Sequence, residues 1–300
     1  MRLDPEAAPK VSVCMIAYQH EAYIRQAIES VLSQEVDFPI ELVIGDDCSP
    51  DGTAAICEEF ARRDPRVRLL PRERNLGVMP NFTRTLQACK GEYIAVCEGD
   101  DYWTDPLKLR KQVRFLDEHG DHAGAAHQSM VLIDDRAERL FRAAVPSTLT
   151  TKDFIGGRMF HTAAIMFRRP AVDLFSGSPP VLSCDRLLNL CISFLGKVHY
   201  SPECMCVYRR HGAGMSYNVS ATQLKTDLNC VPYLAGLDRR FPKYRYKAYV
   251  YATIGLWKRS TVIQKITYTT MAAVYSFSFF PDNVVLAFQW LGRRLTNTTR

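Results

Sequence analysis

Alternation between strand-like and helix-like segments over the first 120 residues constrains the fold of this chain most strongly. Apolar runs of the kind found in strands buried on both faces occupy 11–17, 40–44, 66–70 and 92–97. Segments with apolar residues at helical spacing follow these runs, at 21–34, 53–63, 79–89 and 105–119. A strand followed by a helix four times in succession predicts an α/β fold with a mainly parallel sheet wrapped by helices.

Composition indicates a folded, globular chain with reduced thiols. Apolar residues make up 47% of the 300 residues and charged residues 23%, so we expect disorder only near the ends. The ten cysteines lie mostly in apolar runs without a CxxC spacing, which indicates buried thiols. Cys204 and Cys206 are expected on the same side of a strand. Because the N-terminus lacks an apolar signal-peptide core, we expect a cytoplasmic protein.

Positive charge is concentrated in the last third of the sequence. Residues 207–300 contain 14 lysines and arginines against 3 acidic residues, whereas residues 1–206 contain 24 against 29. This asymmetry predicts that one part performs chemistry and the other meets an anionic surface. A solvated basic helical face would give the same composition.

Polar clusters follow three of the predicted strands at their carboxyl ends. They are Tyr18–Glu21, Asp46–Asp47 and Glu98–Asp101. Ligands of open parallel sheets bind beyond these strand ends, so we expect the three clusters to meet at one edge. Each cluster alone could simply end a strand or cap a helix.

The acidic cluster favours a cation and excludes two common phosphate-binding loops. The first strand is followed by AYQHEAYI, not by a glycine-rich GxGxxG, and no GxxxxGK[ST] occurs. Like charges at Glu98, Asp100 and Asp101 repel one another until a cation binds. Oxygen ligands suit Mg²⁺ or Mn²⁺, which could bridge to a substrate diphosphate. The alternative is a solvated acidic turn.

Four sequence blocks resemble family 2 inverting glycosyltransferases of the GT-A fold. These are VSVCMIAYQHEAYIRQAIESVLSQ, ELVIGDDCSPDGT, NLGVMPNFTRTL and EGDDYWTDPLKL, and the likeness extends from about residue 11 to about residue 216. The resemblance implies a Rossmann-like nucleotide-sugar-binding catalytic domain at 1–218, in which an Asp-x-Asp motif binds a divalent cation and the donor diphosphate. Glu98 departs from the aspartate that is common in the family. Residues 219–300 are expected to form a basic, aromatic-rich helical extension.

The resemblance also assigns donor-binding residues. Those matching the loop beside the nucleotide base are Ala17, Tyr18 and Glu21, and either Asp46 or Asp47 would accept a hydrogen bond from a base N–H, as uracil provides. The block that closes over the nucleotide contains Asn75 and Gly77. Trp103 resembles an aromatic residue that bounds the sugar, although a lone tryptophan more often lies in the core.

Later blocks supply the remaining candidates. Asp185 matches the catalytic base, although it could also cap a helix. His161 and Thr162 lie in the segment that resembles the strand under the acceptor site. The segment VYRRHGAGMS, residues 207–216, resembles the last conserved block of the family. There His211 would join Asp100 and Asp101 at the metal, and Arg209 and Arg210 would contact the diphosphate. An inverting transfer needs one base, because the departing diphosphate requires no separate general acid.

The C-terminal region lacks catalytic signals and does not fit a nucleic-acid-binding module. Residues 271–291 are apolar but are interrupted by Pro281–Asn283, which leaves two pieces too short to span a membrane. We expect Val284–Leu291, followed by Arg293 and Arg294, to lie along a membrane interface or to pack on the main domain. Membrane contact is preferred because polysaccharide acceptors are often lipid-linked.

Together these features predict a metal-dependent enzyme that moves a sugar from a UDP-sugar to a glycan or lipid-linked acceptor. The resembling subgroup implies a role in bacterial cell-surface polysaccharide synthesis, at the inner face of the cytoplasmic membrane. Two rival hypotheses are a sugar-phosphate nucleotidyltransferase, which should carry a phosphate loop that AYQHEAYI lacks, and a non-catalytic scaffold of glycan assembly.

Overall fold

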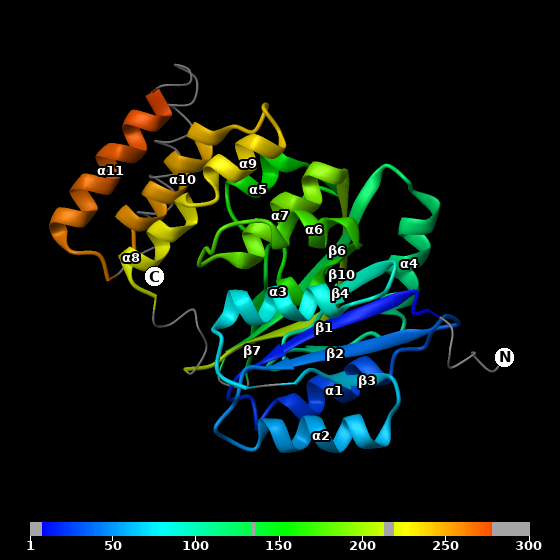
Figure 1. Ribbon diagram of the computed structural model, residues 1–300. Coiled ribbons are helices and arrows are strands. Elements are labelled where there is room, and N and C mark those ends of the chain that lie inside the picture. Colours follow the sequence, from blue (N-terminus) through cyan, green and yellow to red (C-terminus); the bar gives the residue numbers. More distant parts are fainter. Residues whose placement is uncertain (1–7, 72, 134–135, 213–218, 258, 278–300) are drawn as a thin grey trace. The chain divides into compact units, whose positions relative to one another are not determined.

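The computed structural model describes residues 8–71, 73–133, 136–212, 219–257 and 259–277 (Figure 1). The chain divides into two compact units. The first contains residues 1–177 and 185–214, and the second contains residues 178–184 and 215–300.

The first unit is built on one mixed sheet. Its strands are β1 (Val11–Ala17), β2 (Ile40–Asp46), β3 (Val67–Leu69), β4 (Tyr93–Val96), β5 (Tyr102–Trp103), β6 (His122–Ile133), β7 (Arg136–Leu140), β8 (Thr148–Leu149), β9 (Met166–Arg168) and β10 (Lys197–Arg210). Their order is β3-β2-β1-β4-β9-β6-β10-β5, with β7 beside β6 and β8 beside β10. The first four strands are parallel, as are β6 and β10, whereas β9 runs antiparallel to both β4 and β6. The predicted α/β architecture is confirmed.

Helices cover both faces of this sheet. The helix order is α1 (Ile24–Leu32), α2 (Thr53–Arg63), α3 (Val78–Ala88), α4 (Lys108–Glu118), α5 (Thr151–Ile155), the 3₁₀ turn η1 (Thr162–Ala164), α6 (Pro170–Ser176) and α7 (Cys184–Leu195). Helices α1 and α2 lie on one face and α3 on the other (Figure 1). This follows from right-handed crossovers, because the chain moves outward from β1 to β3 and then returns past β1 to β4.

Two helices begin later than predicted, because acidic side chains organise the preceding turns. Helix α1 begins at Ile24 instead of Glu21, whose backbone N–H donates to Asp51. Helix α4 begins at Lys108 instead of Asp105, whose carboxylate accepts the Leu107 N–H. The Asp105–Leu107 contact is an Asx turn, whereas Asp51 reaches Glu21 from a loop 30 residues away, and both carboxylates compete with the helix for backbone donors.

The predicted return strand is also shorter than expected. The segment 160–167 was expected to extend as one strand, but residues Thr162–Ala164 form η1 and β9 starts at Met166. His161 begins the turn, since its ring accepts the Ala163 N–H. Because of this turn, residues 161–163 do not pair with a neighbouring strand of the sheet.

The ten cysteines carry reduced thiols, and eight of them are buried. Burial therefore agrees with the predicted reduced thiols. The expectation that Cys204 and Cys206 share a side of the strand is wrong, because Cys204 is exposed and Cys206 is buried. Register shifts in the pairing of β6 and β10 on both sides of Cys204 break the alternation of an ideal strand.

The second unit is helical. It contains α8 (Ala221–Lys225), the 3₁₀ turn η3 (Thr226–Leu228), α9 (Val231–Leu237), α10 (Lys243–Gly255) and α11 (Val262–Phe277). Stacked tyrosine pairs join α10 to α11, including Tyr251 with Tyr268 and Tyr244 with Tyr275. Across the described ranges, none of the helices has both the length and the apolar character needed to cross a bilayer. The predicted interfacial segment Val284–Leu291 lies outside the described residues.

Candidate active site

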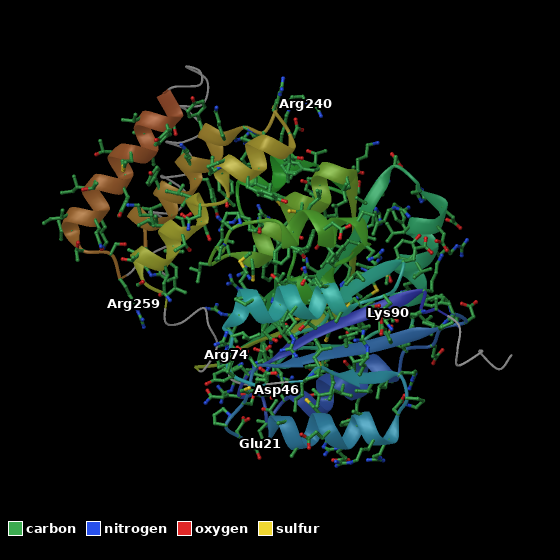
Figure 2. The ribbon with its side chains drawn as sticks, viewed as in Figure 1. Glu21, Asp46, Arg74, Lys90, Arg240 and Arg259 are labelled. Carbon is green, nitrogen blue, oxygen red and sulfur yellow. The ribbon has the colours of Figure 1, made fainter. Side chains whose placement is uncertain are left out.

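The loops after β1 and β2 meet at one end of the sheet. Figure 2 shows Glu21 and Asp46 at this end, whereas Lys90 lies at the opposite end of the strands. The loops are tied together by the Asp47 N–H, which donates to the Ala17 carbonyl at 2.9 Å. Each loop also has a non-glycine residue with positive φ, Gln19 at 58° and Cys48 at 56°. Such backbone strain is common at functional sites.

Several predicted donor-binding side chains are engaged in holding these loops. The Asp47 carboxylate accepts the N–H groups of Leu76 and Gly77 at 2.7 and 2.9 Å. Asn75 donates to the Asp47 carbonyl, and Glu21 accepts the Gly52 N–H. Glu21, Asp47 and Asn75 therefore fix the loops through contacts within the protein.

At the carboxyl ends of β1 and β2, Tyr18 and Asp46 have the chemical character expected of contacts to a nucleotide base. The Tyr18 side chain is 43% exposed, which leaves a flat aromatic face open to a ligand. Asp46 is buried and accepts both the hydroxyl and the N–H of Ser49, at 2.5 and 3.3 Å. A carboxylate offers about four acceptor positions, so one such group can serve several donors.

Glu98 has an unsatisfied oxygen in the acidic turn after β4. Its Oε2 atom is buried and has no hydrogen-bond partner. Burial, together with the charge of Asp100, raises the pKa of Glu98 to about 8, although a hydrogen bond from Thr162 opposes this shift. A buried carboxyl group with an unpaired oxygen is costly unless a cation or a donor occupies the position.

Asp100 lies between two histidines. Its Oδ2 atom is 3.1 Å from Nε2 of His211 and 3.8 Å from Nε2 of His20. Burial acts to raise the pKa of Asp100, but hydrogen bonding to His211 and the proximity of His20 lower it below the ordinary value. The pairing of Asp100 with His211 brings together residues 111 positions apart.

Asp101 points to a different environment from Asp100. Its carboxylate is buried, accepts the Arg209 N–H at 2.8 Å and lies 3.4 Å from Nδ1 of His161. Burial and the charges of Asp100 and Glu98 raise the pKa of Asp101, whereas burial lowers the pKa of His161 to about 3. The predicted metal set of Asp100, Asp101 and His211 is therefore divided between two histidines.

A second possible ligand set follows from this division. Among the described residues, Glu98, Asp101 and His161 have ligand atoms that all lie within 4.8 Å of one another. Both ligand sets draw their carboxylates from the turn Glu98–Asp101, and Asp101 belongs to both. The Asp100 and His211 side chains are 19% and 13% exposed, compared with 2% for Asp101 and 5% for His161.

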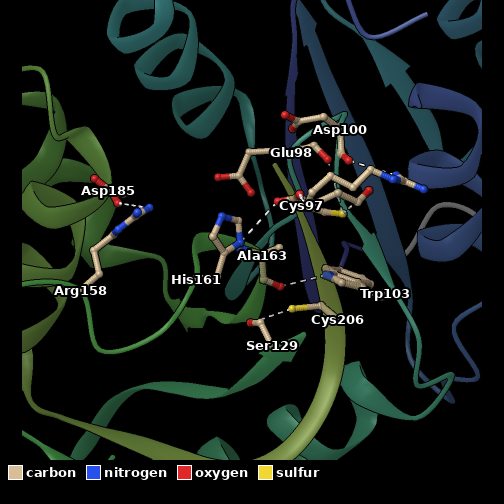
Figure 3. Close-up of polar contacts among 12 residues, drawn as sticks. Cys97, Glu98, Asp100, Trp103, Ser129, Arg158, His161, Ala163, Asp185 and Cys206 are labelled. Atoms are coloured by element: carbon tan, nitrogen blue, oxygen red, sulfur yellow. Dashed lines mark hydrogen bonds and ion pairs between the residues drawn. The ribbon is translucent and has the colours of Figure 1, made fainter. Parts of the chain in front are cut away.

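Asp185 faces the acidic turn from the first turn of α7 (Figure 3). Its Oδ2 atom lies 3.4 Å from Nη1 of Arg158, and its charge contributes to the raised pKa of Glu98. Figure 3 shows Glu98 between Asp100 and the Asp185–Arg158 pair. A half-buried carboxylate thus stands across from the predicted metal and diphosphate site.

The prediction that Trp103 bounds the sugar is corrected by its burial. The Trp103 side chain is 4% exposed, and its Nε1–H donates to the Ala163 carbonyl at 2.9 Å. The ammonium group of Lys108 lies over the ring, 4.0 Å from its centroid. Trp103 therefore anchors η1 beneath the acidic turn, because an indole N–H in the interior requires an acceptor.

Arg209 is likewise engaged within the protein. Its guanidinium lies over the rings of Tyr102 and Tyr23, and it donates to the Asp100 carbonyl and to Gln26. Arg210 is half-buried at the end of β10. The geometry gives Arg209 a role in shaping the acidic turn, in place of the predicted open contact with a diphosphate.

Two residues at the site were not assigned from the sequence. His20 lies in the segment AYQHEAYI after the first strand, and its position beside two polar clusters is a sequence signal for a site residue. Arg158 had no sequence signal, because its partner Asp185 is 27 residues away and neither a motif nor a period connects them.

A comparison with family models matches residues 12–175 to the model described as glycosyl transferase family 2. This match covers more than half of the chain. The chain belongs to glycosyl transferase family 2. The predicted family membership is therefore confirmed.

Relatives within the family support this assignment. An uncharacterized protein of Mycobacterium tuberculosis is 36% identical over 219 residues, which cover 72% of this chain and 63% of that protein. TuaG of Bacillus subtilis, named as a teichuronic acid biosynthesis glycosyltransferase, is 28% identical over 73% of this chain and 86% of its own length. The chain thus spans less than two thirds of the mycobacterial relative.

Solved structures share the fold of this family 2 chain. TarS of S. aureus, in complex with UDP-GlcNAc, superposes with a TM-score of 0.69 at 18% identity, over 92% of this chain and 83% of TarS. The mannosyltransferase PcManGT of Pyrobaculum calidifontis, in complex with GDP-Man and Mn²⁺, gives 0.57 at 17% identity, over 97% and 82%. The predicted GT-A fold is confirmed by these neighbours.

Proposed function

We propose that this family 2 glycosyltransferase transfers a sugar, with inversion, from a nucleotide sugar to a hydroxyl group of a glycan or lipid-linked acceptor. The observation that carries the proposal is the convergence of Glu98 and Asp100 with Asp185 from a distant helix. A diphosphate-binding group and a base must face each other across the reacting carbon in a single displacement. We assign residues 1–218 to this catalytic function.

We propose a UDP-sugar as the donor. Support comes from TarS, whose complex contains UDP-GlcNAc and whose TM-score is higher than that of the GDP-Man complex. In this chain, Tyr18 would stack on the base and Asp46 would accept its N–H, while Ala17 and Gly77 would contribute backbone at the rim. Thr162 and Arg210 are proposed to contact the sugar and diphosphate.

We propose that a divalent cation, Mn²⁺ or Mg²⁺, binds at the acidic turn. The unpartnered oxygen of Glu98 and the carboxylate of Asp100 fit such an ion, since hard cations take oxygen ligands. Asp100 and His211 are the favoured ligands, because they are more exposed than Asp101 and His161 and a substrate phosphate must also reach the ion. When bound, the cation would neutralise charge on the departing diphosphate.

Asp185 is proposed to take the proton of the acceptor hydroxyl. Its position in the first turn of α7 fixes the backbone, and the ion pair with Arg158 orients the carboxylate. General bases must lie within hydrogen-bonding reach of the proton that they abstract, so this orientation is part of the catalytic geometry. Arg158 acts through Asp185 and is a positioning residue.

The biological setting is proposed from the relatives. TuaG is named for teichuronic acid biosynthesis, and ExoO of Rhizobium meliloti, another relative, is named for succinoglycan biosynthesis. By likeness, we propose a role in cell-surface polysaccharide assembly at the cytoplasmic face of the membrane, without a nucleic-acid partner.

A donor screen tests this function. The purified protein is incubated with UDP-, GDP- and dTDP-sugars and Mn²⁺, and release of nucleoside diphosphate is followed together with the anomeric configuration of the product. We expect release of UDP from one UDP-sugar and inversion at the anomeric carbon. Retention of configuration, or formation of pyrophosphate from a nucleoside triphosphate and a sugar phosphate, would overturn the proposal.

A further inference from the structure

Helix α11 of the second unit presents apolar side chains on its outward face. Val262, Ile263 and Ile266 are 72%, 77% and 65% exposed, and Val274 is 57% exposed. These residues recur at intervals of three, four and eight positions, which places them along one side of the helix. A surface helix of a globular protein normally shows the reverse arrangement.

The outward face carries no charge. Its remaining exposed residues, judged from the helical spacing, are Thr267, Thr270, Met271 and Ala273. The opposite face contacts α10 through Tyr268 and Tyr275, which stack on Tyr251. The apolar character of the outward face is therefore not used in packing against α10.

Basic and aromatic side chains accompany this face on α11 and on the neighbouring helix α10. Lys265 is exposed at one margin. On the neighbouring helix α10, the ammonium groups of Lys243 and Lys247 lie over the rings of Tyr244 and of Tyr275, at 5.2 and 5.4 Å from their centroids. An exposed apolar stripe with lysine and tyrosine nearby is typical of helices that lie in the headgroup region of a membrane.

Positive charge in the described part of the second unit is not compensated by acidic residues. Its two described acidic residues are engaged within the protein, since Asp227 is buried and accepts from Ser183 and Asp238 pairs with Arg240. The basic residues of the same ranges are Lys225, Arg239, Arg240, Lys243, Arg245, Lys247, Arg259 and Lys265. This imbalance is complementary to an anionic lipid surface.

We propose that the outward face of α11 lies in the headgroup region of an anionic phospholipid bilayer. The apolar side chains enter the boundary with the acyl chains, and the surrounding lysines contact the lipid phosphates. The site differs from the predicted segment Val284–Leu291, and the proposal does not depend on the donor or on the chemistry of the first unit.

Vesicle binding tests the proposal with the 300-residue chain. Sedimentation with phosphatidylglycerol–phosphatidylcholine vesicles should show binding that increases with the anionic fraction and decreases with salt. Ile263→Glu/Ile266→Glu should lower the partition coefficient on the order of tenfold or more, because two apolar side chains no longer enter the bilayer. Donor hydrolysis by this variant should be unchanged.

A matched control adds a charge at an exposed apolar residue of the first unit. Leu195 at the end of α7 is 45% exposed, and Leu195→Glu should bind vesicles as the wild type does. The proposal is overturned if the wild type stays in solution at every lipid composition, or if the double variant binds as well as the wild type.

A fluorescence measurement separates lipid from protein as the occupant of the face. A polarity-sensitive label on Ile263→Cys, in a Cys204→Ser background because Cys204 is also exposed, should shift to shorter wavelength only when anionic vesicles are added. A label that is already blue-shifted without lipid would show that another segment of the chain, or a second copy, covers the face. Coverage by a chain segment or by a second copy would overturn the proposal. Light scattering would distinguish the two, because only a second copy raises the molar mass.

Discussion

Asp100 and Asp101 are adjacent in sequence but differ in every contact that determines their chemistry. Asp100 pairs with His211 and is partly exposed, whereas Asp101 is buried beside His161 and the Arg209 N–H. The two carboxylates point to different partners in the structure, so they need not serve the same ligand. The two residues should therefore respond differently to removal of charge.

We expect Asp100→Asn to weaken Mn²⁺ binding on the order of tenfold or more, since a ligand that faces the donor loses its charge. Asp101→Asn should bind Mn²⁺ nearly as the wild type does. Calorimetric titration of the purified proteins without a donor measures both affinities. If Asp101→Asn alone lost the ion, the set of Glu98, Asp101 and His161 would be the metal site.

Asp185→Asn should lower kcat by about 10² to 10⁴, because general-base catalysis contributes a factor of this size. The dissociation constant of the donor should stay the same, since Asp185 is placed toward the acceptor. Steady-state kinetics measure kcat, and titration with the donor measures its dissociation constant. Asp173→Asn is the matched control, because Asp173 also lies in the first turn of a helix but is exposed. A loss of donor binding in Asp185→Asn would contradict the assigned role.

At the scale of elements, the start of α3 depends on a glycine. Gly77 has φ 83° and ψ 164°, a region that only glycine readily adopts, and a Cβ atom there would meet no atom within 4 Å. Gly77→Ala should therefore lower the free energy of unfolding by about 1 to 3 kcal/mol through the backbone alone. Urea unfolding measures the change.

The control for that substitution is Gly120→Ala. Gly120 also has open space at the Cβ position, but it has no positive φ, so the change should stay below about 1 kcal/mol. Equal losses at the two positions would mean that the conformation of Gly77 is not the source of the effect.

Helix α4 buries a lysine, Lys108, against the ring of Trp103. Burial lowers the pKa of Lys108 from 10.5 to about 8. Between these values the folded protein releases a proton that the unfolded chain keeps, so the free energy of unfolding rises with pH. The rise should reach at most about 3 kcal/mol.

Lys108→Met should remove this rise when urea unfolding is compared at about pH 7.5 and about pH 10. Lys111→Met is the control on the same helix, because Lys111 is largely exposed and its pKa is raised by pairing with Asp105 and Glu203. A Lys108→Met variant with the pH dependence of the wild type would show that Lys108 keeps its ordinary pKa.

At the scale of the whole molecule, donor and cation should stabilise the fold together. A nucleotide sugar at one hundred times its dissociation constant adds about 2.7 kcal/mol to the free energy of unfolding, which raises Tm by several degrees. We expect this shift with the active UDP-sugar and Mn²⁺, and its loss with EDTA. Thermal scans with UDP alone and with EDTA alone separate the contribution of the nucleotide to Tm from that of the cation. A full shift in EDTA would contradict the proposed cation.

Local patterns in the sequence predicted the elements of the first unit well. Strand β1 and helix α2 have the predicted bounds, because apolar periodicity and turn residues act over a few positions. The beginnings of α1 and α4 were missed, since the side chains of Asp51 and Asp105 compete for backbone donors near each helix. Such competition depends on turn geometry that periodicity does not describe.

The sequence by itself determined the α/β fold, the family and the edge of the sheet at which the polar clusters lie. Only the tertiary structure decided which carboxylate faces which partner. Trp103 and Arg209 turned inward, and Arg158 joined Asp185, through contacts between residues 27 to 109 positions apart. The physical reason is that strand and helix patterns follow from neighbours along the chain, whereas burial and charge pairing arise only when distant segments pack together.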